Sequence, residues 1–291
     1  MALAVLAWAS AAFADAGPGE WRSDAYYAVN GAVTAALIGG NVLARLSRRG
    51  LEAGGDTVWF PGDAGLRGKC SPEADQLSDV ALSLTVALPP AMELGGGLSS
   101  RFVNAQVVYT QALFATTLLT SVAKVIFRRP RPFSYRRDAE CTFQVDGDDA
   151  NLSFFSGHSS GAFAAAFAGS FLMSERADSE TRAAIWGSEL ALAGATANLR
   201  ARAGKHYYSD IFVGALVGAG VGLAVPALHG ADEAPRGSDM LAGAIGLVVG
   251  VTGSQLVAIG AEAIDEGASS TVALSPLLGA GTHGLLATGS F

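Results

Sequence analysis

Seven apolar segments, separated by loops that carry glycine, proline and charge, limit this chain to a helical fold. They are expected at about 27–46, 78–92, 105–127, 158–173, 183–198, 210–228 and 240–260, and all are more typical of helices than of strands. Half of the residues are hydrophobic and 15% are charged, against roughly a quarter charged in an average soluble protein. The sequence therefore predicts an all-α fold, a helical bundle of six core helices plus one additional C-terminal helix.

The length of each segment bears on whether the bundle lies in a membrane. A helix that crosses a bilayer needs about 20 apolar residues, and the first, third, sixth and seventh segments reach that length. The second is interrupted by Asp79, Pro89, Pro90 and Glu93, the fourth is short, and the fifth carries Glu189. We expect either a membrane domain or a very apolar globule. The acidic net charge of -7 argues against a nucleic-acid partner.

The two ends of the chain differ from the bundle. Residues 1–14 are predicted to be a signal peptide, because an apolar run leads to an A-x-A site at 12–14, with cleavage before Asp15. A first membrane anchor is the alternative. The tail at 263–291 is rich in small residues and follows the additional helix at 238–262. We expect this tail to be extended or irregular.

Three polar clusters interrupt the apolar pattern, each at the end of a segment. In chain order they are Lys124 with Arg131 and Pro132; Ser156 with Gly157 and His158; and Arg200 with His206 and Asp210. The first ends the third segment, the second begins the fourth, and the third joins the fifth to the sixth. Because neighbouring helices alternate in direction in an up-and-down bundle, all three clusters are expected at one end.

These residue types suit the transfer of a phosphoryl group. Guanidinium groups pair with phosphate through two bonds, lysine adds a point charge, and Gly157 at a helix start lets the backbone approach an anion. One histidine can attack phosphorus while another protonates the leaving oxygen. Asp210 lies one turn after His206 and can hold its imidazole; like Ser156, it can also cap a helix. Since no carboxylate cluster suggests Mg²⁺, no metal site is expected, and the arginines would replace the metal.

The order and spacing of the clusters resemble the type 2 phosphatidic acid phosphatase (PAP2) family, which includes bacterial non-specific acid phosphatases and vanadium haloperoxidases. The family pattern is K-x6-RP, then PSGH, then SR-x5-H-x3-D. This sequence departs from it at Phe155, in place of proline, and at Leu199, in place of serine. Neither departure removes a charge or a proton carrier. The resemblance implies a PAP2-like catalytic core at 105–229, preceded by N-terminal bundle helices at 20–104.

The resemblance also implies a role for each matched residue. His206 would be the nucleophile that forms a phosphohistidine, Asp210 would orient it, and His158 would be the general acid. The residues that would bind phosphate are Lys124, Arg131, Arg200, Ser156 and Gly157. No cofactor is expected, and vanadate is expected to inhibit; in a haloperoxidase, vanadate would instead be the cofactor.

The activity that follows is metal-independent hydrolysis of phosphate monoesters, with a lipid phosphate or an isoprenoid diphosphate as substrate. A bacterial-type inner membrane with the site facing the periplasm is the expected location. The alternatives are a soluble periplasmic acid phosphatase, a vanadate-dependent haloperoxidase and an inactive membrane scaffold. Signal cleavage would start the mature chain outside, and a spanning first helix would then put the site in the cytoplasm. Either the N-terminal segment is retained or the helices do not alternate simply.

Two further groups of residues lie near the same end. Cys70 and Cys141 fall in loops that the helix count places together, and they could form a disulfide in an oxidising compartment. Four arginines around the first cluster match nothing in the family pattern. They are predicted to be a solvated rim, with attraction of anionic substrate as the alternative; they are Arg128, Arg129, Arg136 and Arg137.

Overall fold

The computed structural model describes residues 22–55, 58–136, 141, 143, 147–175, 177–231, 235–269, 273–279 and 282–288. The predicted signal peptide at 1–14 lies outside the described residues, as does Arg137.

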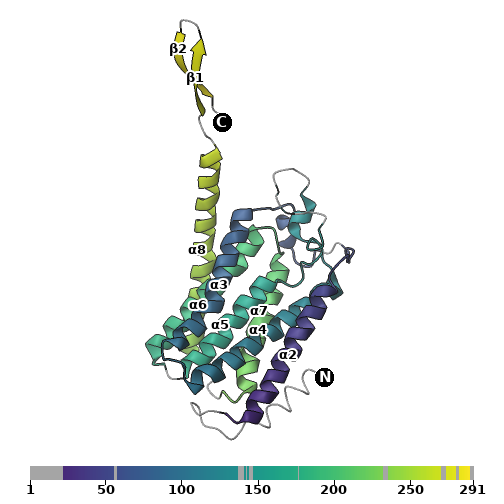
Figure 1. Ribbon diagram of the computed structural model, residues 1–291, viewed down its shortest axis with the longest axis vertical. Helices are drawn as coiled ribbons and strands as arrows, with labels where there is room; N and C mark the ends of the chain where they lie inside the picture. Colours follow the sequence, from purple (N-terminus) through teal and green to yellow (C-terminus); the bar gives the residue numbers. More distant parts are fainter. Residues whose placement is uncertain are drawn as a thin grey trace.

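Seven α-helices lie in the described residues: α2 (Asp24–Leu46), α3 (Pro72–Leu94), α4 (Ser100–Phe127), α5 (Gly157–Ser174), α6 (Ser179–Arg202), α7 (Tyr208–Leu228) and α8 (Gly237–Ser269) (Figure 1). Two short 3-10 helices, η1 (Asp63–Leu66) and η2 (Pro132–Tyr135), lie in the loops after α2 and α4. Each predicted apolar segment falls within one of these helices. The prediction of an all-α bundle with one additional C-terminal helix is confirmed.

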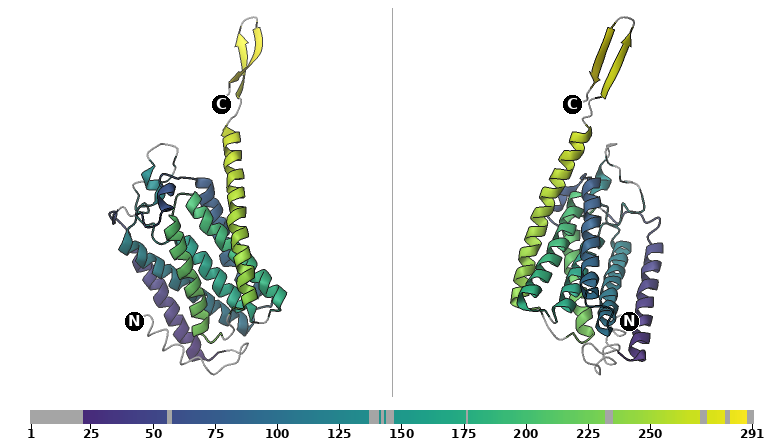
Figure 2. Two further views of the ribbon diagram at one scale, coloured as in Figure 1. Left: turned by 180° about the vertical axis from the view of Figure 1, so that it is seen from behind. Right: turned by 60° about the vertical axis from the view of Figure 1, so that its left-hand side comes forward.

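Helix α5 occupies the centre of the bundle, where it packs against α3, α4, α6 and α7. Helix α2 packs on α4 at one flank and α8 on α6 at the other, as the two views of Figure 2 show. Alanines line much of α5 and are fully buried, among them Ala162, Ala165 and Ala168. Small side chains on a central helix let four neighbours pack closely around it.

Helices α5 and α7 approach one another through glycines spaced four residues apart on α7. A Cβ atom at Gly218 would lie 2.2 Å from the backbone oxygen of Ser160, and one at Gly214 would lie 2.8 Å from that of Ser156. The close approach brings the first turns of both helices together, and the backbone N–H of Ser156 donates to the backbone oxygen of Asp210 at 3.0 Å. The second and third polar clusters are joined here.

Helix α3 is longer than the sequence suggests. It spans 23 residues and continues through Pro89 and Pro90, so the prediction that the second segment is too short to cross a membrane is wrong. Pro90 has no N–H for the backbone oxygen of Val86, and the Tyr109 hydroxyl of α4 donates to that oxygen instead, at 2.9 Å. A neighbouring side chain thus satisfies the group that the proline leaves free.

Five helices, α2, α3, α4, α7 and α8, are long and apolar enough to cross a membrane. Their outer faces expose large apolar side chains, including Val42, Leu84, Ile126, Leu216 and Val248. Exposed apolar surface on this scale is typical of contact with lipid or with another protein.

Helix α8 continues to Ser269, so the prediction of an extended or irregular tail from residue 263 is wrong for 263–269. Strands β1 (Ala273–Gly279) and β2 (Thr282–Thr288) pair antiparallel, with Ala273 opposite Thr288, and Figure 1 shows the hairpin beyond the end of α8.

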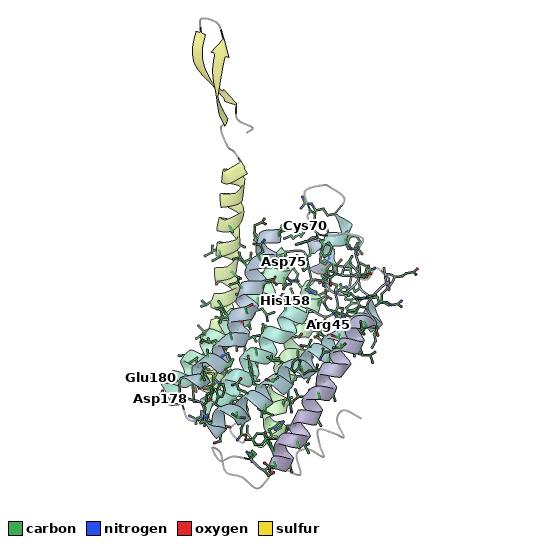
Figure 3. All side chains as sticks on the ribbon, viewed as in Figure 1. Arg45, Cys70, Asp75, His158, Asp178 and Glu180 are labelled. Atoms are coloured by element: carbon green, nitrogen blue, oxygen red, sulfur yellow. A yellow bond between two sulfur atoms is a disulfide. The ribbon has the colours of Figure 1, made fainter. Side chains whose placement is uncertain are left out.

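A disulfide joins Cys70, next to the start of α3, to Cys141 in the loop before α5, with the two Cα atoms 5.8 Å apart. The sequence separation is 71 residues, and closing a loop of this size stabilises a fold by roughly 4 kcal/mol in the chain-entropy treatment. Figure 3 shows Cys70 at the same end of the bundle as Asp75 and His158.

The glycine contact between α5 and α7 yields a matched pair of substitutions. Gly218→Ala should destabilise the protein by about 1–3 kcal/mol, because the added methyl group would overlap the backbone of α5. Gly220→Ala, on the same helix, meets nothing within 4 Å and should stabilise by about 0.5–1 kcal/mol through helix propensity. Thermal unfolding in detergent measures both. Equal midpoints for the two variants would contradict the packing described.

Candidate active site

The three polar clusters lie at one end of the bundle. Lys124 is in the last turn of α4, His158 is in the first turn of α5, and Arg200 is in the last turn of α6. Figure 3 places His158 at this end and Asp178 and Glu180, which begin α6, at the other. The alternation of helix direction brings the clusters together although many residues separate them.

His206 lies fully buried in the turn between α6 and α7. Its Nε2 atom is 3.2 Å from Nη1 of Arg131. Because a guanidinium can only donate, Nε2 carries the lone pair and Nδ1 carries the proton. Nδ1 makes no hydrogen bond and faces Oδ2 of Asp210 at 3.8 Å. The ring therefore presents a neutral nitrogen to a group of cations.

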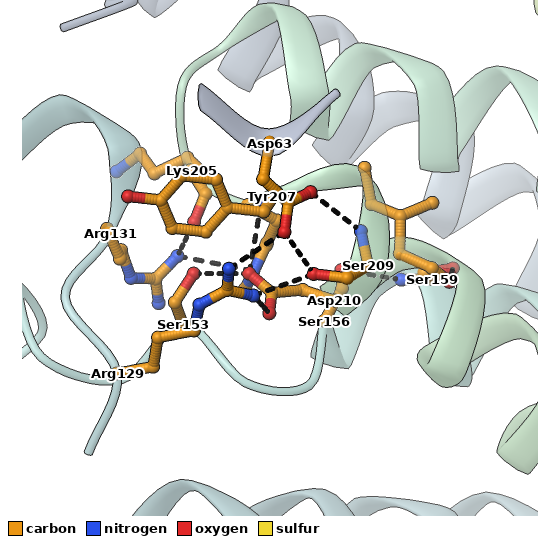
Figure 4. Close-up of polar contacts among 12 residues, drawn as sticks. Asp63, Arg129, Arg131, Ser153, Ser156, Ser159, Lys205, Tyr207, Ser209 and Asp210 are labelled. Carbon is orange, nitrogen blue, oxygen red and sulfur yellow. Dashed lines mark hydrogen bonds and ion pairs between the residues drawn. The ribbon is translucent and has the colours of Figure 1, made fainter. Parts of the chain in front are cut away.

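Asp210 is held by several donors on both carboxylate oxygens. Oδ2 accepts from the Ser153 hydroxyl at 2.5 Å and from the backbone N–H of Tyr207 at 2.9 Å, which caps the start of α7. Oδ1 accepts from Nη1 of Arg129 at 2.5 Å (Figure 4). Asp210 is thus both a helix cap and the carboxylate nearest to the protonated side of His206.

Arg129 is buried rather than part of a solvated rim, so that prediction is wrong for this residue. Its exposed fraction is 1%, and it bridges Asp210 to Asp63 of η1, whose Oδ2 lies 2.9 Å from Nη2. The rings of Trp59 and Tyr207 lie 4.4 and 4.0 Å from the guanidinium carbon. Arg128 and Arg136 are only partly exposed.

Arg129 and Arg131 both point inward after the end of α4. Arg128 ends the helix in a left-handed conformation, and the two arginines that follow are 1% and 3% exposed. Arg131 donates through Nη2 to Oδ1 of Asp149 at 2.7 Å and through Nη1 to the backbone oxygen of Lys205 at 3.1 Å. The two arginines serve different partners, since one holds Asp210 and the other reaches His206.

Two of the remaining cations of the site are paired with Asp75 of α3. Arg200 donates through Nη1 to Oδ1 of Asp75 and, at 3.0 Å, to the Ser78 hydroxyl. Lys205 places Nζ 3.3 Å from Oδ2 of Asp75. Lys124 is buried, and its charge acts on both His158 and His206. The carboxylate of Asp75 thus contacts both the guanidinium group of Arg200 and the ammonium group of Lys205.

His158 pairs with a second acidic residue of α3. Its Nε2 atom lies 2.6 Å from Oδ1 of Asp79. Asp75 and Asp79 are one turn apart on α3. Asp75 pairs with Arg200 and Lys205. Asp79 pairs with His158, and its Oδ1 atom also lies 3.8 Å from Nη1 of Arg200.

Burial and the surrounding cations disfavour protonation of both histidines. Burial, then Arg131 and Lys124, hold the pKa of His206 well below its usual value. Burial, then Arg200 and Lys124, lower the pKa of His158 to about 3. Each ring is therefore neutral at neutral pH.

Ser156 and Gly157 shape the start of α5. The Ser156 hydroxyl accepts from the backbone N–H of Ser159 at 3.2 Å, so this residue is the helix cap. Gly157 is the first helical residue, and a Cβ atom there would lie 3.4 Å from the methyl group of Thr120.

The two departures from the family pattern are core residues. Phe155 is buried in an apolar cluster with Ala123 and Phe154, and Leu199 is buried in one with Ala74 and Ala203. Each replacement fills a packed position and adds no polar group to the site.

Sequence reasoning did not identify the acidic partners of the cations. They are Asp63, Asp75, Asp79 and Asp149. Two aspartates spaced four residues apart near the start of an apolar helix were the available signal, because that spacing places both carboxylates on one helix face. Asp63 and Asp149 lie in loops and had no such signal.

The family model of the PAP2 superfamily matches residues 105–233. No curated protein and no solved structure matches the chain. The matched segment begins within α4, runs through α7 and contains all three polar clusters, whereas α2, α3 and α8 lie outside it.

Removing Arg129 tests the buried network. Arg129→Met should destabilise the protein by about 3–5 kcal/mol, because it leaves the carboxylates of Asp63 and Asp210 buried without a counter-charge. Arg128→Met changes the neighbouring, partly exposed arginine and should shift stability by less than about 0.5 kcal/mol. Denaturant unfolding of both variants supplies the comparison, and similar losses in the two would refute the network.

Proposed function

Residues 105–233 of this chain belong to the PAP2 superfamily, and on that premise we propose that the protein is a metal-independent phosphatase acting on phosphate monoesters through a phosphohistidine at His206. The observation that carries this proposal is the state of the His206 ring. Its Nε2 lone pair faces Arg131, and its protonated Nδ1 faces Asp210. A neutral nucleophile set among cations suits attack on an anionic phosphoryl group.

Substrate binding exchanges one set of anions for another. Arg131 is paired with Asp149 and Arg200 with Asp75, and the phosphoryl oxygens of a bound substrate take the place of these carboxylates. Lys124 adds a third positive charge. Free N–H groups at the start of α5, next to Gly157, supply further donors to the anion. These charges offset the negative charge of the transferring group, a role that Mg²⁺ fills in other phosphoryl-transfer enzymes.

The reaction proceeds in two displacements at phosphorus. Nε2 of His206 attacks, the bond between phosphorus and the ester oxygen breaks, and that oxygen takes a proton from protonated His158 and leaves as the alcohol. Asp210 stabilises the positive charge of the phosphorylated ring. A water molecule then attacks phosphorus and gives its proton to His158. The bond to Nε2 breaks, the lone pair returns to His206, and inorganic phosphate leaves.

A lipid phosphate or an isoprenoid diphosphate is the substrate that best suits the surroundings of the site. Apolar side chains lie exposed on five helices of membrane-spanning length, and the site lies at one end of the bundle. A substrate whose phosphate sits at the membrane surface can reach such a site while its chain stays in the bilayer. The same exposed surface favours a membrane enzyme over a soluble periplasmic phosphatase.

The disulfide supports a site that faces the periplasm of a bacterial-type inner membrane. Cys70 and Cys141 pair at the active-site end, and such bonds persist in oxidising compartments. Helix α2 then begins at Asp24 on the cytoplasmic side. In this orientation the segment before α2 is not removed by cleavage outside the membrane.

The role of His206 is tested by His206→Ala in a protein whose fold is verified. Loss of the covalent catalyst should lower kcat on the order of a thousand-fold or more, because a reaction path is removed rather than one contact. His283→Ala, in strand β2, is the matched control and should keep wild-type turnover. Near-normal turnover by a folded His206→Ala variant would contradict the proposed role of His206.

Inhibition tests the metal-free mechanism. Vanadate adopts the five-coordinate geometry of the transition state and should bind more tightly than phosphate. Phosphate release from a panel of lipid and soluble phosphate esters should persist in EDTA. Activity that EDTA abolishes and Mg²⁺ restores would rule the mechanism out.

A further inference from the structure

We propose that Asp79 of α3 is a positioning residue of the phosphatase, which holds His158 through Nε2 and leaves Nδ1 to exchange the proton with the leaving oxygen. The inference rests on the proposed function, in which His158 is the general acid. Asp79 lies outside the segment matched by the family model and outside all three sequence clusters.

The contact itself is short and joins two helices. Oδ1 of Asp79 is 2.6 Å from Nε2 of His158, at the place where α3 packs against α5. A carboxylate can only accept, so Nε2 carries a proton in this pair. The orientation of the imidazole is thereby fixed, and its other nitrogen remains for chemistry.

The position of Asp79 in α3 argues that its contact with His158 has a function. Asp79 follows the first residue of α3 by seven positions, or about 10 Å along the axis. Val80 and Leu84 of the same helix expose large apolar side chains, and α3 is one of the helices long and apolar enough to cross a membrane. A carboxylate in such a segment is costly unless it is paired, and such residues mark functional sites. The Asp79 side chain is 61% exposed, and it pairs with His158 nevertheless.

The pair of His158 and Asp79 counters the positive charges that surround the His158 ring. Arg200, Lys124 and Arg131 all disfavour a second proton on this ring, yet a general acid must carry one. The negative charge of Asp75 opposes them, and Asp79 adds a carboxylate in hydrogen-bond contact with the ring. Its carboxylate therefore stabilises the imidazolium directly, together with the bound substrate anion.

In each histidine of the site, one ring nitrogen is turned towards a carboxylate and the other is kept for the reaction, but the two rings use different nitrogens. His206 turns Nδ1 towards Asp210 and keeps Nε2 for phosphorus. His158 turns Nε2 towards Asp79 and keeps Nδ1 for the leaving oxygen. One carboxylate orients each ring, and the two pairs come from different parts of the chain.

Leaving-group dependence separates a positioning role from a structural one. The leaving group of p-nitrophenyl phosphate needs little protonation, whereas an alkyl phosphate must gain a proton as its oxygen departs. Asp79→Asn should lose about ten- to a hundred-fold more kcat on a medium-chain alkyl phosphate than on p-nitrophenyl phosphate. A loss of packing or folding would lower both activities by the same factor.

Two further variants complete the experiment. Asp75→Asn, one turn away, removes a partner of Arg200 and Lys205 and should change KM for both substrates by similar factors. His158→Asn should show the same leaving-group selectivity as Asp79→Asn, and the double variant should add little to it.

Each result has a distinct meaning. Selectivity in His158→Asn but equal losses, or none, in Asp79→Asn would overturn the inference about Asp79 alone. Absence of selectivity in His158→Asn would remove His158 as the general acid, and the inference with it. Activity surviving in His206→Ala would instead refute the proposed function.

Discussion

One buried arginine joins the parts of the chain on which the site depends. Arg129 contacts Asp63 in the loop before α3 and Asp210 at the start of α7, and both carboxylates are fully buried. The contact fixes the end of α4 relative to α7, and Asp210 in turn faces His206. Because a buried carboxylate without a counter-charge is costly, none of these three groups can move independently. The orientation of the histidine follows from a charge that lies outside the recognised motifs.

Carboxylates neutralise several of the cations that converge at the site. Arg131 is paired with Asp149, and Arg200 and Lys205 are paired with Asp75. Converging cations would otherwise repel one another and destabilise the end of the bundle. In the proposed reaction, the phosphoryl group would compete with these carboxylates rather than with water alone, which favours a ligand with more charge and more oxygens than a carboxylate. Helix α3, outside the family match, supplies Asp75 and also Asp79, whose Oδ1 atom lies 3.8 Å from Nη1 of Arg200.

The sequence predicted the helices and the common end of the clusters because both follow from local patterns. Apolar runs identify helices, and alternating helix direction brings their ends together. The predictions from the sequence were wrong where the structure depends on tertiary contacts. Pro89 and Pro90 remain helical because Tyr109 satisfies a freed carbonyl, and Arg129 turns inward because Asp63 and Asp210 receive it. Asp79 had no local signature of its partner, since His158 lies 79 residues further along the chain.

The central claim is that phosphorus becomes bonded to His206 during turnover. Mixing the enzyme with a phosphate ester, quenching in alkali within one turnover and digesting the protein would reveal the phosphorylated peptide by mass spectrometry. The account predicts a phosphoryl group on the peptide that contains His206, stable in alkali and lost in acid, and absent from His206→Ala. Turnover without any phosphorylated peptide, or with an acid-stable phosphoryl group on another residue, would contradict it.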